Sequence, residues 1–156
     1  KDFIFEGKME SAKDMCQKTQ TPFARMLMKG VTRIGKPLGD ISAAIENRGK
    51  LEVYTLEQGL STLATIAGAA PMIGFLGTVI GMISTFHEMY AAGNSVEISN
   101  LSGGIMQAMV TTAAGLVIGI IAYVSYNLLV SKVDKVVHKM EATSIDFMDL
   151  LSEPAK

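Results

Sequence analysis

Two long stretches of this chain carry no charged side chain, and they constrain its fold more than any other feature. No Asp, Glu, Lys or Arg occurs in residues 58–86 or in residues 98–131. The hydrocarbon core of a bilayer is crossed by about 20 apolar residues of helix, and both stretches exceed that length. The sequence therefore predicts an all-α membrane protein in which two long helices cross the bilayer.

The positions of the cations predict how the chain is oriented. Of the fourteen Lys and Arg residues, ten lie in residues 1–57, four lie in residues 132–156, and none lies in the connecting residues 87–97. Basic residues next to membrane spans are retained on the cytoplasmic side. We therefore expect a cytoplasmic helical region at 1–57, a periplasmic loop at 87–97 between spans at 58–86 and 98–131, and a cytoplasmic amphipathic helix at 132–156.

Prolines predict where the cytoplasmic helices begin and end. Pro22 and Pro37 are expected helix boundaries, because a proline disfavours helix in the residue before it. No further proline occurs before Pro71, so a single long helix could run from the cytoplasm into the bilayer. Gly49 and Gly59 are its weak points.

The C-terminal segment has an apolar stripe at spacings of three and four residues, which is typical of an amphipathic helix. We expect it to pack on the helices of residues 1–57 or on another subunit. A helix lying on the membrane surface is the competing interpretation, but the polar face mixes acids with bases. The stripe consists of Val133, Val136, Val137, Met140, Ser144, Phe147, Met148 and Leu151.

Small residues share one face of each predicted span when successive residues are placed about 100° apart. In lipid, helices associate through close backbone approach across small residues, and both faces contain the G-x-x-x-G spacing. Two arrangements stay open: contact between neighbouring subunits, or a helical hairpin that buries its small faces against each other. The first face has Ala67, Ala70, Pro71, Gly74, Gly77, Thr78, Gly81 and Thr85, and the second has Ala108, Thr112, Gly115, Gly119, Ala122 and Tyr126.

Pro71 is expected to kink the first span, because it lacks the amide hydrogen that would bond to the Ala67 carbonyl. In the second span, Gln107, Tyr126 and Asn127 are candidates for polar contacts with a neighbouring subunit or at the membrane interface.

The polar residues inside the spans are uncharged. Thr78, Thr111 and Thr112 lie near mid-membrane, while no carboxylate, lysine or histidine occurs in either charge-free stretch. Proton relays across membranes use ionisable groups, so a role in moving protons would require a partner that brings a carboxylate. Thr78 and Thr112 either line the surface facing that partner or bond back to carbonyls of their own helices.

The sequence has no pattern that indicates metal binding, catalysis or nucleic-acid binding. Cys16 is the single cysteine, and His87 and His138 are far apart and outside any metal-ligand spacing. The chain has no nucleophile and base pattern, no phosphate-binding loop and no nucleic-acid-binding signature. We therefore expect a protein that is not an enzyme, needs no cofactor or metal and binds no nucleic acid.

Two segments resemble a known family. LATIAGAAPMIGFLGTVIGM, followed by GGIMQAMVTTAAGLVIGIIAYVSYN, is similar to the ExbB/TolQ/MotA proton-channel subunits and most similar to ExbB and TolQ. The likeness is strong over residues 51–141 and loose over the cytoplasmic start, DMCQKTQTPFARML. It implies another spanning helix before the part seen here. It also implies that Thr78 of the GTV motif and Thr112, the second threonine of the TTA motif, face a lumen.

The resemblance further implies an assembly and a function. The expected assembly is a homopentameric ring in the bacterial inner membrane, around an ExbD-like single-span partner whose aspartate lies beside Thr78 and Thr112. The expected function is a stator that uses the proton motive force to energise TonB-dependent outer-membrane transport through a TonB-like protein. A TolQ-like, gliding or flagellar-type stator and a non-transporting membrane scaffold remain alternatives.

The chain departs from the family pattern at two positions. Many relatives have proline where Ile121 stands, so a kink there is not implied for this chain. Some have glutamate where Gln107 stands, so a role for a charge at that position does not transfer.

Overall fold

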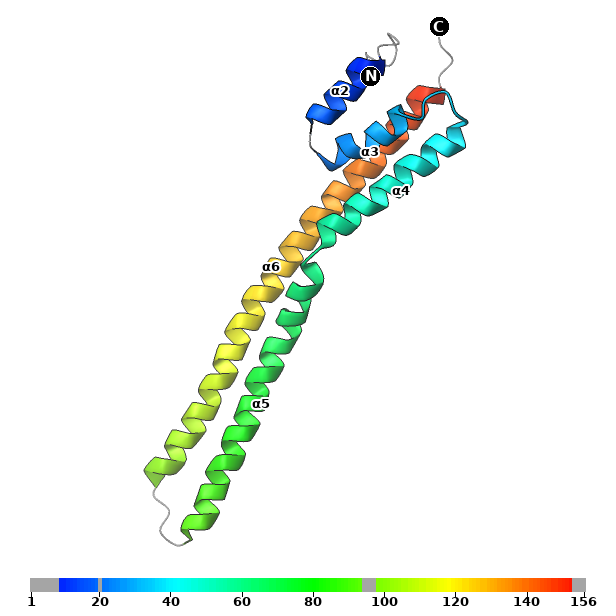
Figure 1. The fold of residues 1–156 in the computed structure, drawn as a ribbon. Coiled ribbons are helices and arrows are strands. Elements are labelled where there is room, and N and C mark those ends of the chain that lie inside the picture. The colour runs from blue at the N-terminus through cyan, green and yellow to red at the C-terminus, as the bar shows by residue number, and fades with distance from the viewer. Residues whose placement is uncertain (1–8, 20, 94–97, 153–156) are drawn as a thin grey trace. The chain divides into compact units, whose positions relative to one another are not determined.

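The computed structural model describes residues 9–19, 21–93 and 98–152, and the elements of this part are all helices (Figure 1). The described residues form two compact units. Residues 59–130 are called the hairpin unit below. The residues up to 58, together with those from 131 onward, are called the charged unit.

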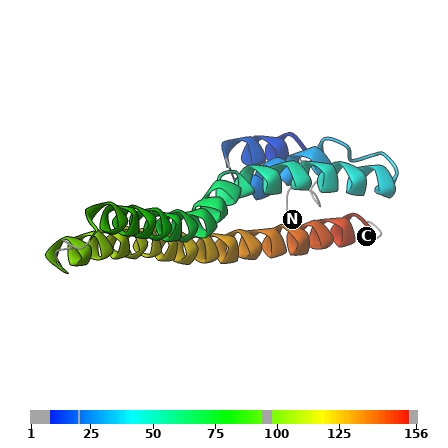
Figure 2. The same ribbon diagram turned by 90° about the horizontal axis from the view of Figure 1, so that it is seen from below.

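The hairpin unit consists of α5 (Leu60–Ala92) and the first part of α6 (Ile98–Ser152), which lie side by side in both views (Figures 1 and 2). The described part of the chain contains two helical stretches that are long and apolar enough to cross a membrane. α5 has 33 residues and so measures about 50 Å, against a hydrocarbon core of about 30 Å. It continues through residues 87–92 of the predicted loop, and residues 94–97 of that loop lie outside the described residues.

The expectation of one unbroken helix from the cytoplasm into the first span is wrong. α4 (Leu38–Glu57) ends two residues before Gly59, whose φ of +87° is a left-handed conformation that glycine adopts without steric cost. The amide of Gln58 donates to the carbonyl of Thr55 at 3.4 Å, a tighter turn than the α-helix. Of the two predicted weak points, only Gly59 interrupts the helix, because Gly49 stays within α4 and is buried.

α6 shows the opposite behaviour. It is one helix of 55 residues that passes through Gly115, Gly119 and Ile121 without interruption. Ile121 is an exposed residue within this helix.

The charged unit is built from α2 (Met9–Lys18), α3 (Pro22–Val31), α4 and the end of α6. Pro22 is the first residue of α3, and the side chain of Thr21 caps that helix by accepting from the Ala24 amide at 3.3 Å. Pro37 immediately precedes α4. The two predicted proline boundaries are therefore confirmed.

The core of the charged unit joins α3, α4 and the end of α6. All eight residues of the predicted C-terminal stripe are buried or half-buried, so that the stripe packs on helices of this same chain. Gly30 of α3 lets these helices approach, because a Cβ there would lie 2.7 Å from Ile45 Cδ1 and 2.8 Å from Phe147 Cε1. The buried core residues are Met26, Val31, Ile41, Ile45, Met140 and Phe147.

Candidate functional site

The small faces of α5 and α6 pack against each other within one chain. A Cβ added at Gly115 would lie 2.6 Å from the Ala70 carbonyl oxygen and 2.8 Å from Gly74 Cα. Both atoms are backbone, so the two helices touch directly where these glycines meet. The structure therefore has the hairpin arrangement, in which the two small faces meet within one chain.

The remaining glycines of the G-x-x-x-G pairs each accommodate one side chain of the opposite helix. A Cβ at Gly81 would lie 2.8 Å from Ala108 Cβ, and one at Gly77 would lie 2.7 Å from Thr111 Oγ1. A Cβ at Gly119 would lie 2.5 Å from Cγ of Pro71. The proline ring thus lies over Gly119, and α5 continues as a helix through Pro71.

Hydroxyl groups bridge the two helices midway along this contact. The hydroxyls of Thr78 and Thr112 are hydrogen-bonded to each other. The Thr78 hydroxyl also lies 3.0 Å from the Ala108 carbonyl oxygen, and the Thr112 hydroxyl lies 3.1 Å from the Gly74 carbonyl oxygen. These bonds cross between the helices, whereas Thr78 is 3.4 Å from the Gly74 carbonyl of its own helix. The sequence left two possibilities, that these hydroxyls face a partner or that they bond to their own helices. In the structure they bond mainly across the two helices, an arrangement that the sequence did not suggest.

Thr111 joins this cluster. Its hydroxyl donates to the Ala108 carbonyl at 2.7 Å, the acceptor that Thr78 also approaches. The sequence placed Thr111 near mid-membrane but not at the site, since its position lies about 100° around the helix from Thr112. Two features could have indicated that Thr111 belongs to the site. It is adjacent to Thr112 in the sequence, and Gly77, which lies opposite it, has no side chain.

The hydrogens of the cluster outnumber its backbone acceptors. A carbonyl oxygen has two lone pairs, and in a helix one of them already accepts an amide hydrogen. The Gly74 and Ala108 carbonyls therefore offer one further position each to the hydroxyls of Thr78, Thr111 and Thr112. The third hydrogen must go to a neighbouring hydroxyl or to an acceptor from outside the chain. Since Thr78 and Thr112 are only half-buried, an outside group could reach them.

Other candidate residues lie away from this cluster or take a packing position. Thr85 is buried, and its hydroxyl donates to the Gly81 carbonyl at 2.8 Å. Its side chain packs against Gly104, a residue that the sequence did not indicate as a packing position. Gln107 is exposed. Tyr126 and Asn127 follow Thr112 by about four helical turns, or about 20 Å, and the Asn127 amide donates to the Tyr123 carbonyl at 2.9 Å. The structure does not bring these polar residues to the threonines.

In the charged unit, an ion-pair cluster absent from the sequence-based expectations joins α3 to α4. Glu52 is buried, and its carboxylate accepts from Arg25 Nε at 2.8 Å and Nη2 at 2.5 Å. Arg48 Nη2 lies 2.6 Å from the same carboxylate. The hydrogen bonds from Arg25 lower the pKa of Glu52 despite its burial, and the bond to Glu52 raises the pKa of Arg25. This carboxylate is therefore ionised at neutral pH and fixes the two helices to each other.

Comparison with known proteins agrees with this architecture. Residues 18–142 match the model of the MotA/TolQ/ExbB proton channel family. An ExbB homologue named for biopolymer transport in Methanothermobacter thermautotrophicus is 30% identical over 135 residues, covering 86% of this chain and 47% of the relative. The biopolymer transport protein exbB1 of Vibrio cholerae is 35% identical over 100 residues, covering 64% of this chain and 43% of the relative.

A third relative, the biopolymer transport protein ExbB of Xanthomonas campestris, is 29% identical over 112 residues, covering 72% of this chain and 44% of the relative. The chain thus spans about half the length, or less, of these three curated relatives.

Proposed function

This chain belongs to the MotA/TolQ/ExbB proton channel family, and from that premise we propose that it is an ExbB-like stator subunit of a bacterial inner membrane. In this proposal, copies of the chain form a ring, expected to be a pentamer, around an ExbD-like single-span partner that carries an aspartate. The complex uses the proton motive force to energise TonB-dependent outer-membrane transport through a TonB-like protein. Both ends of this chain face the cytoplasm.

One observation carries the proposal. The two charge-free stretches have no carboxylate, lysine or histidine, yet Thr78 and Thr112 join their hydroxyls between α5 and α6 within those stretches. A side-chain hydroxyl both donates and accepts hydrogen bonds. The cluster therefore suits a carboxyl group that arrives from a partner in either protonation state.

The hydroxyls would respond to the charge of that carboxyl group. An ionised aspartate only accepts hydrogen bonds, so the Thr78 hydroxyl would turn from Thr112 or Ala108 and donate to it. A protonated aspartate donates, so a threonine oxygen would accept its hydrogen while the threonine hydrogens stay on acceptors within the cluster. Protonation of the partner thus exchanges one hydrogen-bond pattern for another at fixed positions of α5 and α6.

The energies are of matching size. A proton that crosses 100 mV gains about 2.3 kcal/mol. An aspartate at the centre of a membrane span costs about 2.5 to 3.5 kcal/mol on an insertion scale. In this proposal, neutralising the partner's aspartate drives relative motion within the complex.

The test removes the hydroxyls and keeps the side-chain shape. A cell that lacks its own stator subunit would carry this protein in full length with Thr78→Val and Thr112→Val, and uptake of a TonB-dependent ligand would be measured. We expect uptake to fall more than tenfold, because the hydroxyls that receive the aspartate are gone. Thr78→Ser with Thr112→Ser should retain most of the uptake.

Thr65→Val is the matched control, since Thr65 is an exposed residue of α5 whose hydroxyl donates to the Ser61 carbonyl at 2.9 Å. It should leave uptake unchanged, and all variants should reach the same level in the membrane. Wild-type uptake in the double valine variant would contradict the proposal that Thr78 and Thr112 face the lumen. Co-purification with a TolR-like partner in place of an ExbD-like one would support the TolQ-like alternative, and purification with no aspartate-bearing partner would support a scaffold.

A further inference from the structure

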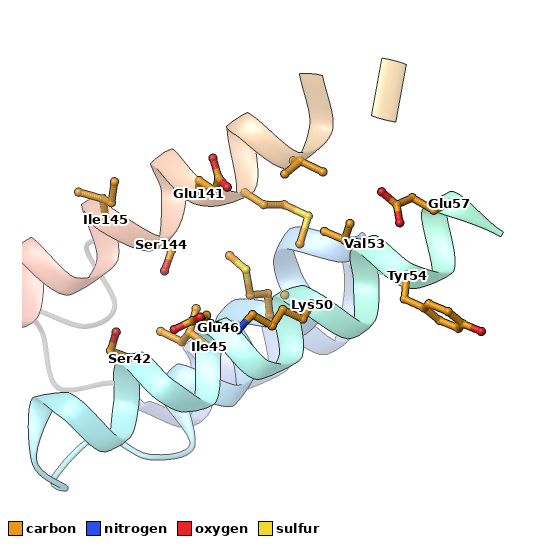
Figure 3. Close-up of a pocket in the computed structure, with 14 residues that line it drawn as sticks. Ser42, Ile45, Glu46, Lys50, Val53, Tyr54, Glu57, Glu141, Ser144 and Ile145 are labelled. Carbon is orange, nitrogen blue, oxygen red and sulfur yellow. Dashed lines mark ion pairs between the residues drawn. The ribbon is translucent and has the colours of Figure 1, made fainter. Parts of the chain in front are cut away.

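A groove of about 620 Å³ lies within the charged unit, between α4 and the end of α6 (Figure 3). Its floor is apolar and includes Met26, Ile45 and Met140, which are buried core residues. Val53 of α4 and Val137 of α6 extend the apolar lining. The volume falls in the range of sites that bind ligands. The apolar surface that the described residues leave uncovered belongs to Val53 and Val137, which are half-buried, and to Tyr54 and Ile145, which are exposed.

The rim of the groove is mainly acidic. Glu46, Glu57 and Glu141 line it together with a single cation, Lys50, which is paired with Glu46 at 2.7 Å. Glu57 makes no ion pair with any described residue. Glu141 lies 3.5 Å from His138, which is a charged partner only when that histidine is protonated. The groove therefore favours an occupant with an apolar stem and positive charges.

The same stretch of α6 carries three lysines on the face turned away from the groove. Lys135 and Ser144, a groove residue, are nine positions apart and so lie about 180° from each other around the helix. Lys132 and Lys139 fall within about 60° of Lys135 on that far face. All three lysines are exposed, and none makes an ion pair with another described residue. They are called the lysine ridge below.

We propose that the groove of one copy receives the lysine ridge of a second copy. This inference rests on the ring of the proposed function and names the surfaces that close it. Because groove and ridge are different surfaces on opposite sides of α6, their contact runs head to tail, which is the kind of interface that closes into a ring. The lysine stems would cover the exposed apolar lining of the groove while their ammonium groups reach the carboxylates at the rim.

The lengths of the two surfaces are compatible. Lys132 and Lys139 are seven residues apart, about 10 Å along α6, while Glu46 and Glu57 are eleven residues apart, about 16 Å along α4. The lysine ridge therefore fits between the acidic groups at the two ends of the groove.

Cysteine cross-linking in the intact membrane complex tests the contact. On a Cys16→Ser background, Lys135→Cys and Ser144→Cys would be combined and treated with a short bis-maleimide. The two positions lie on opposite faces of one helix and about 13 Å apart along it, so they cannot be linked within a chain by a short reagent. We expect dimers and higher multiples of this chain, with a yield at least fivefold above that of the control.

The control pairs Ser144→Cys with Asp134→Cys, which is exposed and adjacent to Lys135 but about 100° away around the helix. A second experiment reverses charge in the cross-linking variant. Glu57→Lys with Glu141→Lys should lower the yield about two- to fivefold, as expected for exposed ion pairs, and adding Lys132→Glu with Lys139→Glu should restore it.

Mass measurement of the intact complex separates this inference from the proposed function. A ring of several copies in which the Lys135 pair links no better than the Asp134 pair would overturn the groove contact and leave the ring standing. Cross-links that join this chain to a different protein would also overturn it, because the groove would then belong to that partner. A complex with one copy of this chain would remove both the ring and the contact.

Discussion

The helices within the hairpin unit and the helices within the charged unit are held together by different kinds of contact. In the hairpin unit, α5 and α6 meet backbone to backbone at Gly74 and Gly115, and uncharged hydroxyls supply the polar contacts. In the charged unit, large side chains such as Ile45 and Phe147 fill the core, and a buried carboxylate is held by two guanidinium groups.

The surroundings explain the difference. In water, helices associate because large apolar side chains leave the solvent. In lipid that driving force is absent between helices, so contact depends on small residues and on hydrogen bonds that satisfy every polar group. The comparison predicts that the hairpin unit is sensitive to added atoms and the charged unit to removed ones.

The largest expected effect comes from emptying the core of the charged unit. Ile45 is fully buried, and Ile45→Ala should lower the free energy of unfolding by about 3 kcal/mol through lost apolar contact and the cavity left behind. The measurement is denaturant-dependent proteolysis of the charged unit in detergent. Leu51→Ala is the control, because Leu51 on the same helix is 58% exposed, and equal losses in the two variants would contradict this account of the core.

Adding one methyl group should damage the hairpin unit. Gly115→Ala places a Cβ against backbone atoms that cannot move aside, and we expect a loss of about 2 kcal/mol. Gly77→Ala should cost less, because its Cβ meets only the side chain of Thr111. Unfolding in mixed micelles, followed by circular dichroism, measures both. Gly68→Ala has open space around it and should not destabilise the protein, and a loss there equal to that of Gly115→Ala would argue against close helix contact.

Neutralising the buried carboxylate of the charged unit should have a somewhat smaller effect. Glu52→Gln weakens charge-assisted hydrogen bonds from partly exposed arginines and should cost about 1 to 2 kcal/mol at neutral pH. The pKa of Glu52 is lowered in the folded state from its ordinary value of 4.5. Its contribution is therefore complete above about pH 4.5 and is lost as the pH falls through the lowered folded value.

Proteolysis of the charged unit between pH 3 and pH 7 follows this contribution. The wild type should lose its advantage over Glu52→Gln toward the acidic end of the range. Glu46→Gln is the control, since Glu46 forms an exposed pair with Lys50 and should change stability little. A constant difference between wild type and Glu52→Gln down to pH 3 would indicate that the pKa of Glu52 is the same in the folded and unfolded states, so that the arginines do not stabilise its ionised form.

The smallest expected effect concerns the hydroxyl cluster. Thr111→Ala frees the Ala108 carbonyl to accept from Thr78. The Thr78 hydroxyl then donates less readily to a carboxylate from outside the chain. We expect uptake to fall two- to threefold. Stability should change by less than about 1 kcal/mol, because the bond lost to the Ala108 carbonyl lies within α6 and a single hydrogen bond contributes about that much or less. Thr111→Ser should keep wild-type uptake, and a tenfold loss in Thr111→Ala would place that residue among the groups that meet the partner directly.

The sequence by itself determined the features that depend on local patterns. The charge-free stretches predicted two helices long enough to span a bilayer, and Pro22 and Pro37 predicted helix boundaries. The C-terminal stripe predicted an amphipathic helix, and its apolar residues are buried or half-buried. Each follows from the length, periodicity or backbone chemistry of a single segment. The resemblance to the proton-channel family also depended on contiguous residues, and the family match confirms it.

Only the tertiary structure decided which surfaces meet. The small faces could have paired within the chain or between chains, because their sequence pattern is the same in both cases, and here α5 and α6 pair within it. The sharing of the Ala108 carbonyl by Thr78 and Thr111, and the meeting of Arg25 with Glu52 across 27 positions, depend on how separate helices pack. Helical periodicity defines the face on which a side chain lies, but the partner of that face is set by the packing of the whole chain.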